Sequence, residues 1–287
     1  MKKILLATTM LVGTAGFASA EVSFSGSAAA GVAMNGTADG GDADPNAYML
    51  TDDTMHTYTN ASLDVTFSGA TDTGLEFGAT FGLSTGRSYG LASDDGFGAN
   101  DGIFGAPEVF VSGSFGRIAF AVDDYDFFDD ANGSGDVSYS GTFGAFTVGI
   151  IADVDASEFS GSASGTFGGF TLSANADTYG ETNASAGYTM GAFTAELNVG
   201  QSDVDGTTSS VTGTYSAGAI TASATYNDDS SWDVSTDYSA NSISAGLSYD
   251  SDSNYTLTAG YDLGGGLSLE AGYNNTQDAF VGAAMSF

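Results

Sequence analysis

Apolar and polar residues alternate with a period of two through nearly the whole chain after residue 20. Within 74–81, for example, Leu75, Phe77 and Phe81 fall on one face of an extended strand, whereas Glu76 and Thr80 fall on the other. Successive side chains of a strand point to opposite faces, so this alternation indicates strands with one apolar and one polar face. No segment shows the helical period of about 3.6 residues, and the pattern therefore predicts an all-β protein.

The alternation is divided into hairpins of one design. An aromatic residue ends a strand, a few small or polar residues turn the chain, and an apolar residue begins the next strand. The closing aromatic residues are Phe67, Phe115, Phe143, Phe167, Tyr188, Tyr215, Tyr238 and Tyr261. Eight hairpins supply sixteen strands, and the segments 21–35 and 278–287 add one at each end, so the count is eighteen.

The connections at the other end of the hairpins are longer and acidic in the first half, near 36–55, 86–105 and 125–135. In the second half they are short, as at 203–206 and 250–253. Short turns at one end and longer loops at the other are typical of outer-membrane barrels, in which closure pairs every backbone group inside the lipid. We therefore expect a transmembrane antiparallel β-barrel of 16–18 strands with an aqueous interior. The alternative is a secreted solenoid or adhesin, which the absence of a G-G-x-G-x-D repeat disfavours.

The first twenty residues have the three parts of a secretory signal peptide. Lys2 and Lys3 give a positive start, an apolar stretch follows at 4–12, and the triplet Ala18-Ser19-Ala20 has the small residues of a cleavage site. No later segment approaches about 20 consecutive apolar residues. We expect a signal peptide at 1–20 and a single barrel domain at 21–287 in the Gram-negative outer membrane.

Acidic residues outnumber basic ones by 36 to 4, and the formal net charge is −32. This charge excludes a nucleic-acid-binding protein, because almost nothing could neutralise phosphates. The chain has no Cys, and His56 is its single histidine. Cysteine nucleophiles, zinc clusters and two-histidine metal sites are therefore excluded. Carboxylates are abundant, but no motif positions a substrate, and we do not expect an enzyme or a cofactor.

Three short segments and the C-terminus resemble one known family. The segments are 71–79 (TDTGLEFGA), 112–118 (SGSFGRI) and 261–266 (YDLGGG), and the chain ends Met285-Ser286-Phe287. They are similar to the general diffusion porins of alphaproteobacteria, especially of purple photosynthetic bacteria. The resemblance implies a homotrimer in outer-membrane lipid, a passive water-filled pore in each subunit, and insertion by the outer-membrane assembly machinery with Phe287 as the signal. It also implies a third loop that constricts the pore with acidic residues opposite basic ones.

The chain departs from that pattern in three respects. The strand count of eighteen exceeds the sixteen usual in the family, and the third connection, at 125–135, is short for a large inward loop. Basic residues after the signal peptide are limited to Arg87 and Arg117, so the basic wall is missing. A nearly uniform negative potential in the pore would draw in cations and exclude anions.

Several groups of residues are candidates for selectivity. The densest acidic cluster is interleaved with Tyr125, Phe127 and Phe128, and it is either a constriction element or a solvated outer loop that binds divalent cations loosely. The acids of this cluster are Asp123, Asp124, Asp126, Asp129 and Asp130. Arg117 is a further candidate, and we expect it to pair with a carboxylate. Acids on the polar face of expected strands should face the pore, because charge on the lipid face is unfavourable; they are Glu76, Glu108, Glu196, Asp233, Asp237 and Glu270. Diffuse binding of calcium or magnesium is expected at Asp39, Asp42, Asp44, Asp94 and Asp95.

The sequence thus predicts a porin that passes small hydrophilic solutes and prefers cations. Two other functions remain open. One is an acidic structural, adhesive or divalent-binding surface protein without general pore activity. The other is a substrate-specific channel with a saturable site. The acidity itself also suits a saline habitat, in which it would serve solubility.

Overall fold

The computed structural model describes residues 21–34, 55–89, 97–104, 107–126, 134–202 and 206–287, without the side chains of 87–106 and 122–134. The described residues form nineteen strands. These are β1 (Glu21–Met34), β2 (Met55–Ala70), β3 (Glu76–Tyr89), β4 (Phe97–Phe104), β5 (Glu108–Gly113), β6 (Gly116–Asp126), β7 (Ser134–Phe143), β8 (Phe146–Asp153), β9 (Glu158–Phe167), β10 (Phe170–Asp177), β11 (Thr182–Met190), β12 (Phe193–Ser202), β13 (Gly206–Ala217), β14 (Ile220–Asn227), β15 (Trp232–Ala240), β16 (Ile243–Asp250), β17 (Tyr255–Gly264), β18 (Leu267–Asn274) and β19 (Ala279–Ser286).

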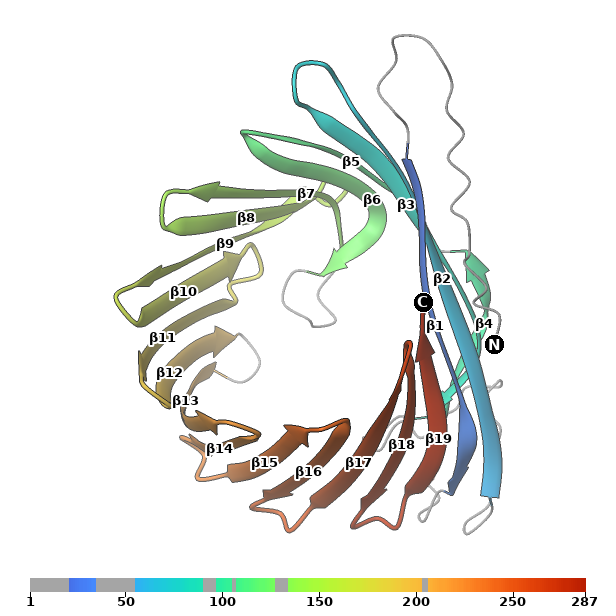
Figure 1. Cartoon of the computed structure of the whole chain (residues 1–287). Coiled ribbons are helices and arrows are strands. Elements are labelled where there is room, and N and C mark those ends of the chain that lie inside the picture. The colour runs from blue at the N-terminus through green and yellow to red at the C-terminus, as the bar shows by residue number, and fades with distance from the viewer. Residues whose placement is uncertain (1–20, 35–54, 90–96, 105–106, 127–133, 203–205) are drawn as a thin grey trace.

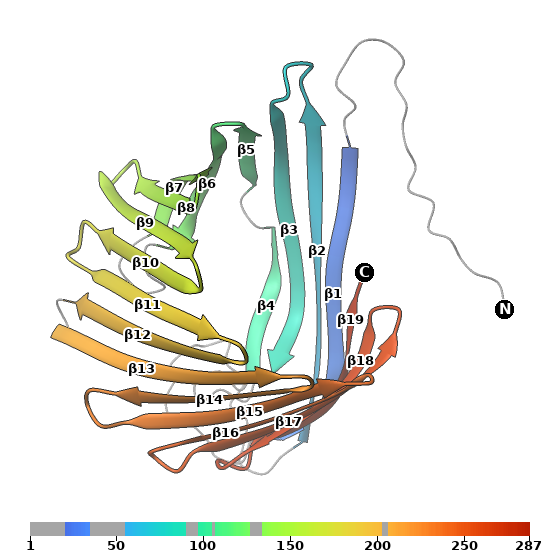
Figure 2. The same cartoon turned by 60° about the vertical axis from the view of Figure 1, so that its left-hand side comes forward.

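The strands form one antiparallel sheet that closes on itself (Figures 1 and 2). The last strand, β19, pairs with β1 from Ser27↔Ser286 to Met34↔Ala279. Beyond that pair, the N–H of Gly26 donates to the Phe287 carbonyl at 2.9 Å, and the N–H of Phe287 donates back to Gly26 at 3.0 Å. The expected antiparallel β-barrel is therefore confirmed, and its closure leaves no open sheet edge at the seam.

The nineteen strands occupy eighteen positions around the barrel. Both β4 and β5 pair with the same edge of β3: β4 from Leu83↔Phe104 to Tyr89↔Phe97, and β5 from Glu76↔Ser112 to Thr80↔Glu108. They are two parts of one interrupted strand, so nineteen minus one gives the eighteen strands that the hairpins predict.

The prediction of one long connection over 86–105 is wrong in its extent. Strand β3 continues to Tyr89, and β4 begins at Phe97, so both flanks of that stretch are strands. This region is rich in Gly, Ser and Asp and lacks the alternation on which the expectation was based. Backbone pairing with β2 and β4 extends β3 all the same, because ladder hydrogen bonds do not depend on apolar side chains.

Most turns at one end of the barrel are two residues long, and the turn between β2 and β3, at 71–75, has five residues. Gly144, Gly191 and Gly218 hold the first turn position with φ of 66°, 63° and 60°. In the turn between β15 and β16, Asn241 and Ser242 have φ of 51° and 66°. Positive φ at these positions is the mark of the primed hairpin turns, whose twist matches that of the strands. The short turns that the sequence predicts are present here.

Four loops at the other end share one five-residue geometry; they are 177–181, 227–231, 250–254 and 274–278. In each, the first residue donates its N–H to the carbonyl of the fifth at 2.9–3.1 Å. The fourth residue has φ between 69° and 93°. The second residue donates to a carbonyl of the neighbouring strand, as Ser251 does to Trp232 at 2.8 Å. These loops are therefore tied both to themselves and to the adjacent hairpin.

The first of these loops carries a tyrosine bonded to a carboxylate. The hydroxyl of Tyr179 donates to Glu158 at the start of β9. Within the same loop, Asp177 Oδ1 accepts from the N–H groups of Tyr179 and Glu181 at 3.0 and 2.8 Å. The hydrogen bond to Glu158, with burial and nearby acids adding to it, raises the pKa of Tyr179 to about 12.

The barrel wall is irregular between β6 and β7. The pair Phe120↔Val137 is followed by Tyr125↔Gly135, so β6 advances five residues while β7 advances two. The extra residues form a large bulge, which bends a strand. In Figure 1 the end of β6 turns at this point toward the inside of the ring.

Candidate functional site

The register divides the barrel wall into an apolar and a polar face. Large apolar side chains lie together on the first face and are uncovered: Phe170 and Phe193 are 53% and 59% exposed. Near the two-residue turns, their rings pair across neighbouring hairpins, with centroids 4.5 Å apart for Phe170–Tyr188 and 4.8 Å for Phe193–Tyr215. Aromatic rings at the ends of an uncovered apolar band are typical of the two interfaces of a membrane.

The polar face is built on rows of hydroxyl groups. Opposite residues of neighbouring strands hydrogen-bond through their side chains, including Ser173–Ser185 at 2.7 Å, Ser223–Ser235 at 2.8 Å and Thr66–Thr80 at 2.9 Å. Cross-strand hydroxyl pairs of this kind stabilise a sheet and leave oxygen lone pairs for water. The polar face is therefore suited to contact with water.

The six acids expected on the polar face all lie there by register. Each has a polar residue or a glycine as a cross-strand partner: Glu76↔Ser112, Glu108↔Thr80, Glu196↔Thr212, Asp233↔Asp250, Asp237↔Gly246 and Glu270↔Gly260. They are spread over strands β3, β5, β12, β15 and β18 and do not form one cluster. The arrangement produces a distributed negative charge over much of the face.

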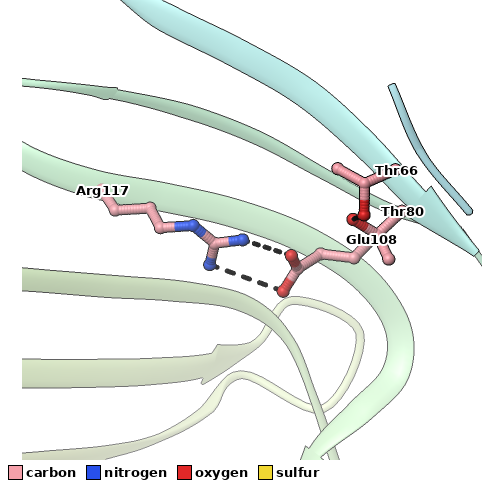
Figure 3. Close-up of polar contacts among 4 residues, drawn as sticks. All are labelled: Thr66, Thr80, Glu108 and Arg117. Atoms are coloured by element: carbon pink, nitrogen blue, oxygen red, sulfur yellow. Dashed lines mark hydrogen bonds and ion pairs between the residues drawn. The ribbon is translucent and has the colours of Figure 1, made fainter. Parts of the chain in front are cut away.

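Arg117 has a carboxylate partner on the neighbouring strand. At the start of β6, its guanidinium makes an ion pair with Glu108 of β5 (Figure 3). The guanidinium also lies over the ring of Phe110, with Cζ 4.5 Å from the centroid. The side chains of Arg117 and Glu108 are 37% and 24% exposed. Figure 3 also shows the pair beside the Thr66–Thr80 row. The positive charge of Arg117 is thus partly neutralised by Glu108, an acid of the same face.

The other candidates of the acidic cluster are only partly described. The backbones of Asp123, Asp124 and Asp126 belong to β6, whose end bends inward in Figure 1, but their side chains lie outside the description. Asp129 and Asp130 lie outside the described residues altogether, as do the candidate cation-binding residues Asp39, Asp42, Asp44, Asp94 and Asp95.

Two absences concern only the described part of the chain. Its residues contain no helix long and apolar enough to cross a membrane. Among these same residues, no three His, Asp or Glu side chains come close enough together to hold a metal ion.

Three aromatic residues of the polar face were missed by sequence reasoning. Phe110 receives Arg117, Tyr58 is buried against the wall, and Phe280 lines a hollow with Glu270. The alternation of side chains along each strand could have placed these three residues on the polar face. Tyr58 alternates with Thr57 and Thr59, so the register turns the threonines to the apolar face and the tyrosine to the polar one.

Comparisons with known proteins agree with this architecture. A family model described as Gram-negative porin matches residues 7–285. An engineered triple mutant of the Rhodopseudomonas blastica porin is 16% identical, with a TM-score of 0.55, and the match covers 93% of this chain and 100% of that one. A second mutant of the same porin is 13% identical, with the same TM-score and coverage. No curated protein sequence matches.

Proposed function

Because the chain belongs to the Gram-negative porin family, we propose that its barrel encloses a water-filled, acid-lined channel that passes small hydrophilic solutes by diffusion and prefers cations. Family and fold support an outer-membrane channel protein, as the resemblance implied. The cation preference follows from the charges of this chain. Passage through such a channel needs neither a cofactor nor an energy source.

The orientation of the two faces supports an acid-lined channel. Several buried side chains lie on the polar face, among them Ala33, Tyr58, Ala119 and Ser160. Tyr58 of β2 even reaches across β1 to β19. Side chains on the concave face of a barrel converge, whereas those on the convex face spread apart. The polar face is therefore the inner one, and the apolar face meets lipid.

The single observation that carries the cation preference is the charge balance of the polar face. The six expected acids share it with Arg117 and with further acids such as Asp64, Asp250 and Asp262, and Arg117 is already paired with Glu108. A wall of one sign sets up a potential that raises the local concentration of counter-ions. This potential weakens as salt screens it, over a Debye length of about 8–10 Å at physiological ionic strength.

The constriction is proposed at the end of β6. Its inward turn in Figure 1 carries Asp123, Asp124 and Asp126 away from the regular wall, and Asp129 and Asp130 follow in the sequence. Carboxylates at the narrowest part of a pore act most strongly on a passing ion. Loose binding of calcium or magnesium at Asp39, Asp42, Asp44, Asp94 and Asp95 is proposed as a secondary effect of the same acidity.

Assembly is proposed to follow the family resemblance. Residues 1–20 direct export and are cleaved, Phe287 serves as the signal for the assembly machinery, and three subunits form a homotrimer. Phe287 suits this role because its ring is 71% exposed at the end of the closing strand.

Single-channel recording in a planar bilayer under a KCl gradient tests the function. We expect openings in steps of three, with a reversal potential of the sign that marks cation preference. The preference should fall as total salt rises, because salt screens the acids. Folded protein without conductance would overturn the channel and favour an acidic surface protein. Conductance with anion preference would keep the channel and overturn the proposal that the acids make it prefer cations.

A further inference from the structure

One row of the polar face carries no charge from β9 to β14. Its residues are successive cross-strand partners with hydroxyl or amide side chains: Ser164, Ser173, Ser185, Asn198, Ser210 and Asn227. The next row toward the five-residue loops continues with Asn175, Asn183, Gly200 and Thr208. Hydroxyl and amide groups both donate and accept hydrogen bonds. These two rows can therefore exchange hydrogen bonds with a solute that has no charge.

The two rows border a hollow over Gly200. A cavity of about 340 Å³ lies on strands β11–β14, in the yellow-to-orange part of Figures 1 and 2. Its volume is within the roughly 300–1,000 Å³ of small-molecule sites. The polar-face side chains that line it include Asn183, Asn198, Thr208, Ser210 and Asn227. Gly200 itself has no side chain, and the wall is therefore open between β11 and β13.

Two polar side chains lean over Gly200 toward one point. At the position that a Cβ on Gly200 would take, Thr208 Oγ1 is 3.0 Å away and Asn183 Nδ2 is 3.6 Å away. Asn183 and Thr208 are the cross-strand partners of Gly200 on β11 and β13, so they approach this point from opposite sides. Neither side chain hydrogen-bonds to another described residue. An amide donor and a hydroxyl thus converge over the glycine and remain available to a solute.

Two further amides of the lining are held in place by bonds to their neighbours. Asn198 Nδ2 donates to Glu196 Oε1 at 3.2 Å, and Asn227 Nδ2 donates to Ser231 Oγ at 2.9 Å. These bonds use the amide N–H groups, so the Oδ1 atoms are left as acceptors. The hollow therefore offers a donor and several acceptors at fixed positions.

This pattern favours a neutral hydroxyl group over a cation. A cation over Gly200 would face the positive end of the Asn183 amide. A hydroxyl at the same place can accept from Asn183 Nδ2 and donate to Thr208 Oγ1. The described residues that line the hollow include no Lys or Arg, and its acids, Asp228 and Asp229, belong to the loop 227–231 at its border.

We propose that this hollow, the Gly200 hollow, binds neutral polyhydroxylated solutes, the chemical class of sugars, within the channel. One hydroxyl of the solute lies over Gly200, between Asn183 and Thr208, and neighbouring hydroxyls bond to Asn198 Oδ1 and Ser210 Oγ. Each bond replaces one with water, so binding is weak and the solute is released again. The inference rests on the proposed channel and names a class of solute for it.

The test uses maltose as the probe on the folded, full-length protein in a planar bilayer. Added maltose should reduce the KCl current in a saturable manner. Gly200→Ala places a methyl group where the solute hydroxyl would lie and should weaken this block about tenfold. Asn183→Ala removes one donor and should weaken the block about fivefold, which corresponds to one hydrogen bond.

Each variant has a control on the same face, outside the hollow. Gly187→Ala adds a methyl group on β11 that would lie in ordinary contact, 3.7 Å from the Ala195 carbonyl oxygen. Asn60→Ala removes an amide from the polar face of β2. Both controls should leave the block constant unchanged. Equal weakening by the variants and their controls would show a general effect of the wall and overturn the site.

Calorimetry of maltose binding to the folded protein in detergent separates the two proposals. Maltose binding that is lost in Gly200→Ala, in a protein that gives no KCl current, would overturn the channel and keep the site. A KCl current without maltose binding would overturn the site and keep the channel. Heat-dependent mobility on gels checks that each variant is folded.

Discussion

The hydroxyl of Tyr58 on β2 occupies the space that a side chain at Gly282 on β19 would need, although β1 lies between these two strands. Tyr58 is only 6% exposed, so the phenol lies flat against the wall. It crosses the seam at which the last strand meets the first. The tyrosine and the glycine beneath it therefore pack the closure of the barrel from the inside.

Gly282→Ala should weaken this closure. A methyl group there would overlap the Tyr58 hydroxyl and lie 2.7 Å from the Ala30 carbonyl oxygen. Overpacking of this kind typically destabilises a protein by about 1–3 kcal/mol. The measurement is the temperature at which the folded band is lost on gels. Gly213→Ala is the control, because no atom lies within 4 Å of a methyl group there. An equal loss in both variants would contradict the seam contact.

Single and double substitutions of Arg117 and Glu108 should shift ion preference in opposite directions. Arg117→Gln releases Glu108 and should raise cation preference, whereas Glu108→Gln releases Arg117 and should lower it. The double variant should return close to the parent, because the pair carries no net charge. Reversal potentials in a KCl gradient provide the measurement. The half-exposed pair contributes at most about 1 kcal/mol to stability, so the double variant should fold normally.

Charge reversal of two polar-face acids should move the channel toward anions. Glu76→Lys with Glu270→Lys changes the charge of the wall by four units at strands β3 and β18. The matched control places one lysine at Asp72, an exposed residue of the turn between β2 and β3. We expect a large change of reversal potential for the first variant and a small one for the control. An unchanged potential in the double variant would show that these acids do not face the pore.

Alkaline titration should reveal Tyr179 as a late-ionising tyrosine. The Glu158 bond raises the pKa of Tyr179 from 10.0 to about 12 in the folded state. The stabilisation from this bond is thus complete below pH 10 and is lost as the pH rises through about 12. Ultraviolet titration of tyrosinate in the folded protein should lose its last component in Tyr179→Phe. A titration curve unchanged by that substitution would show that Tyr179 ionises with the other tyrosines.

Local pattern was enough to predict the regular part of the barrel. Alternation and closing aromatic residues fixed the hairpins from Phe143 onward, and parity alone placed Glu196 and Glu270 on the polar face. Strand β4 was missed because Phe97–Phe104 is rich in Gly, Asn and Asp. Its pairing is determined by the free edge of β3, which is a property of the assembled sheet.

Contacts between distant segments could not be predicted in the same way. The charge imbalance indicated that Arg117 would meet an acid, but only the register identifies Glu108 among many. Tyr58 and Gly282 are separated by most of the chain, and nothing local links them.

The pairing of β1 with β19 also has a consequence for the order of folding. The partner of β1 on one side is β19, which comes last in chain order among the described strands. Until residues 279–286 arrive, one edge of Ser27–Met34 keeps unpaired N–H and C=O groups, which could recruit strands of other chains. Contacts this distant in sequence also form slowly. Pairing with residues 279–286 therefore covers the free edge of β1, and removing these residues should cause aggregation rather than a smaller barrel.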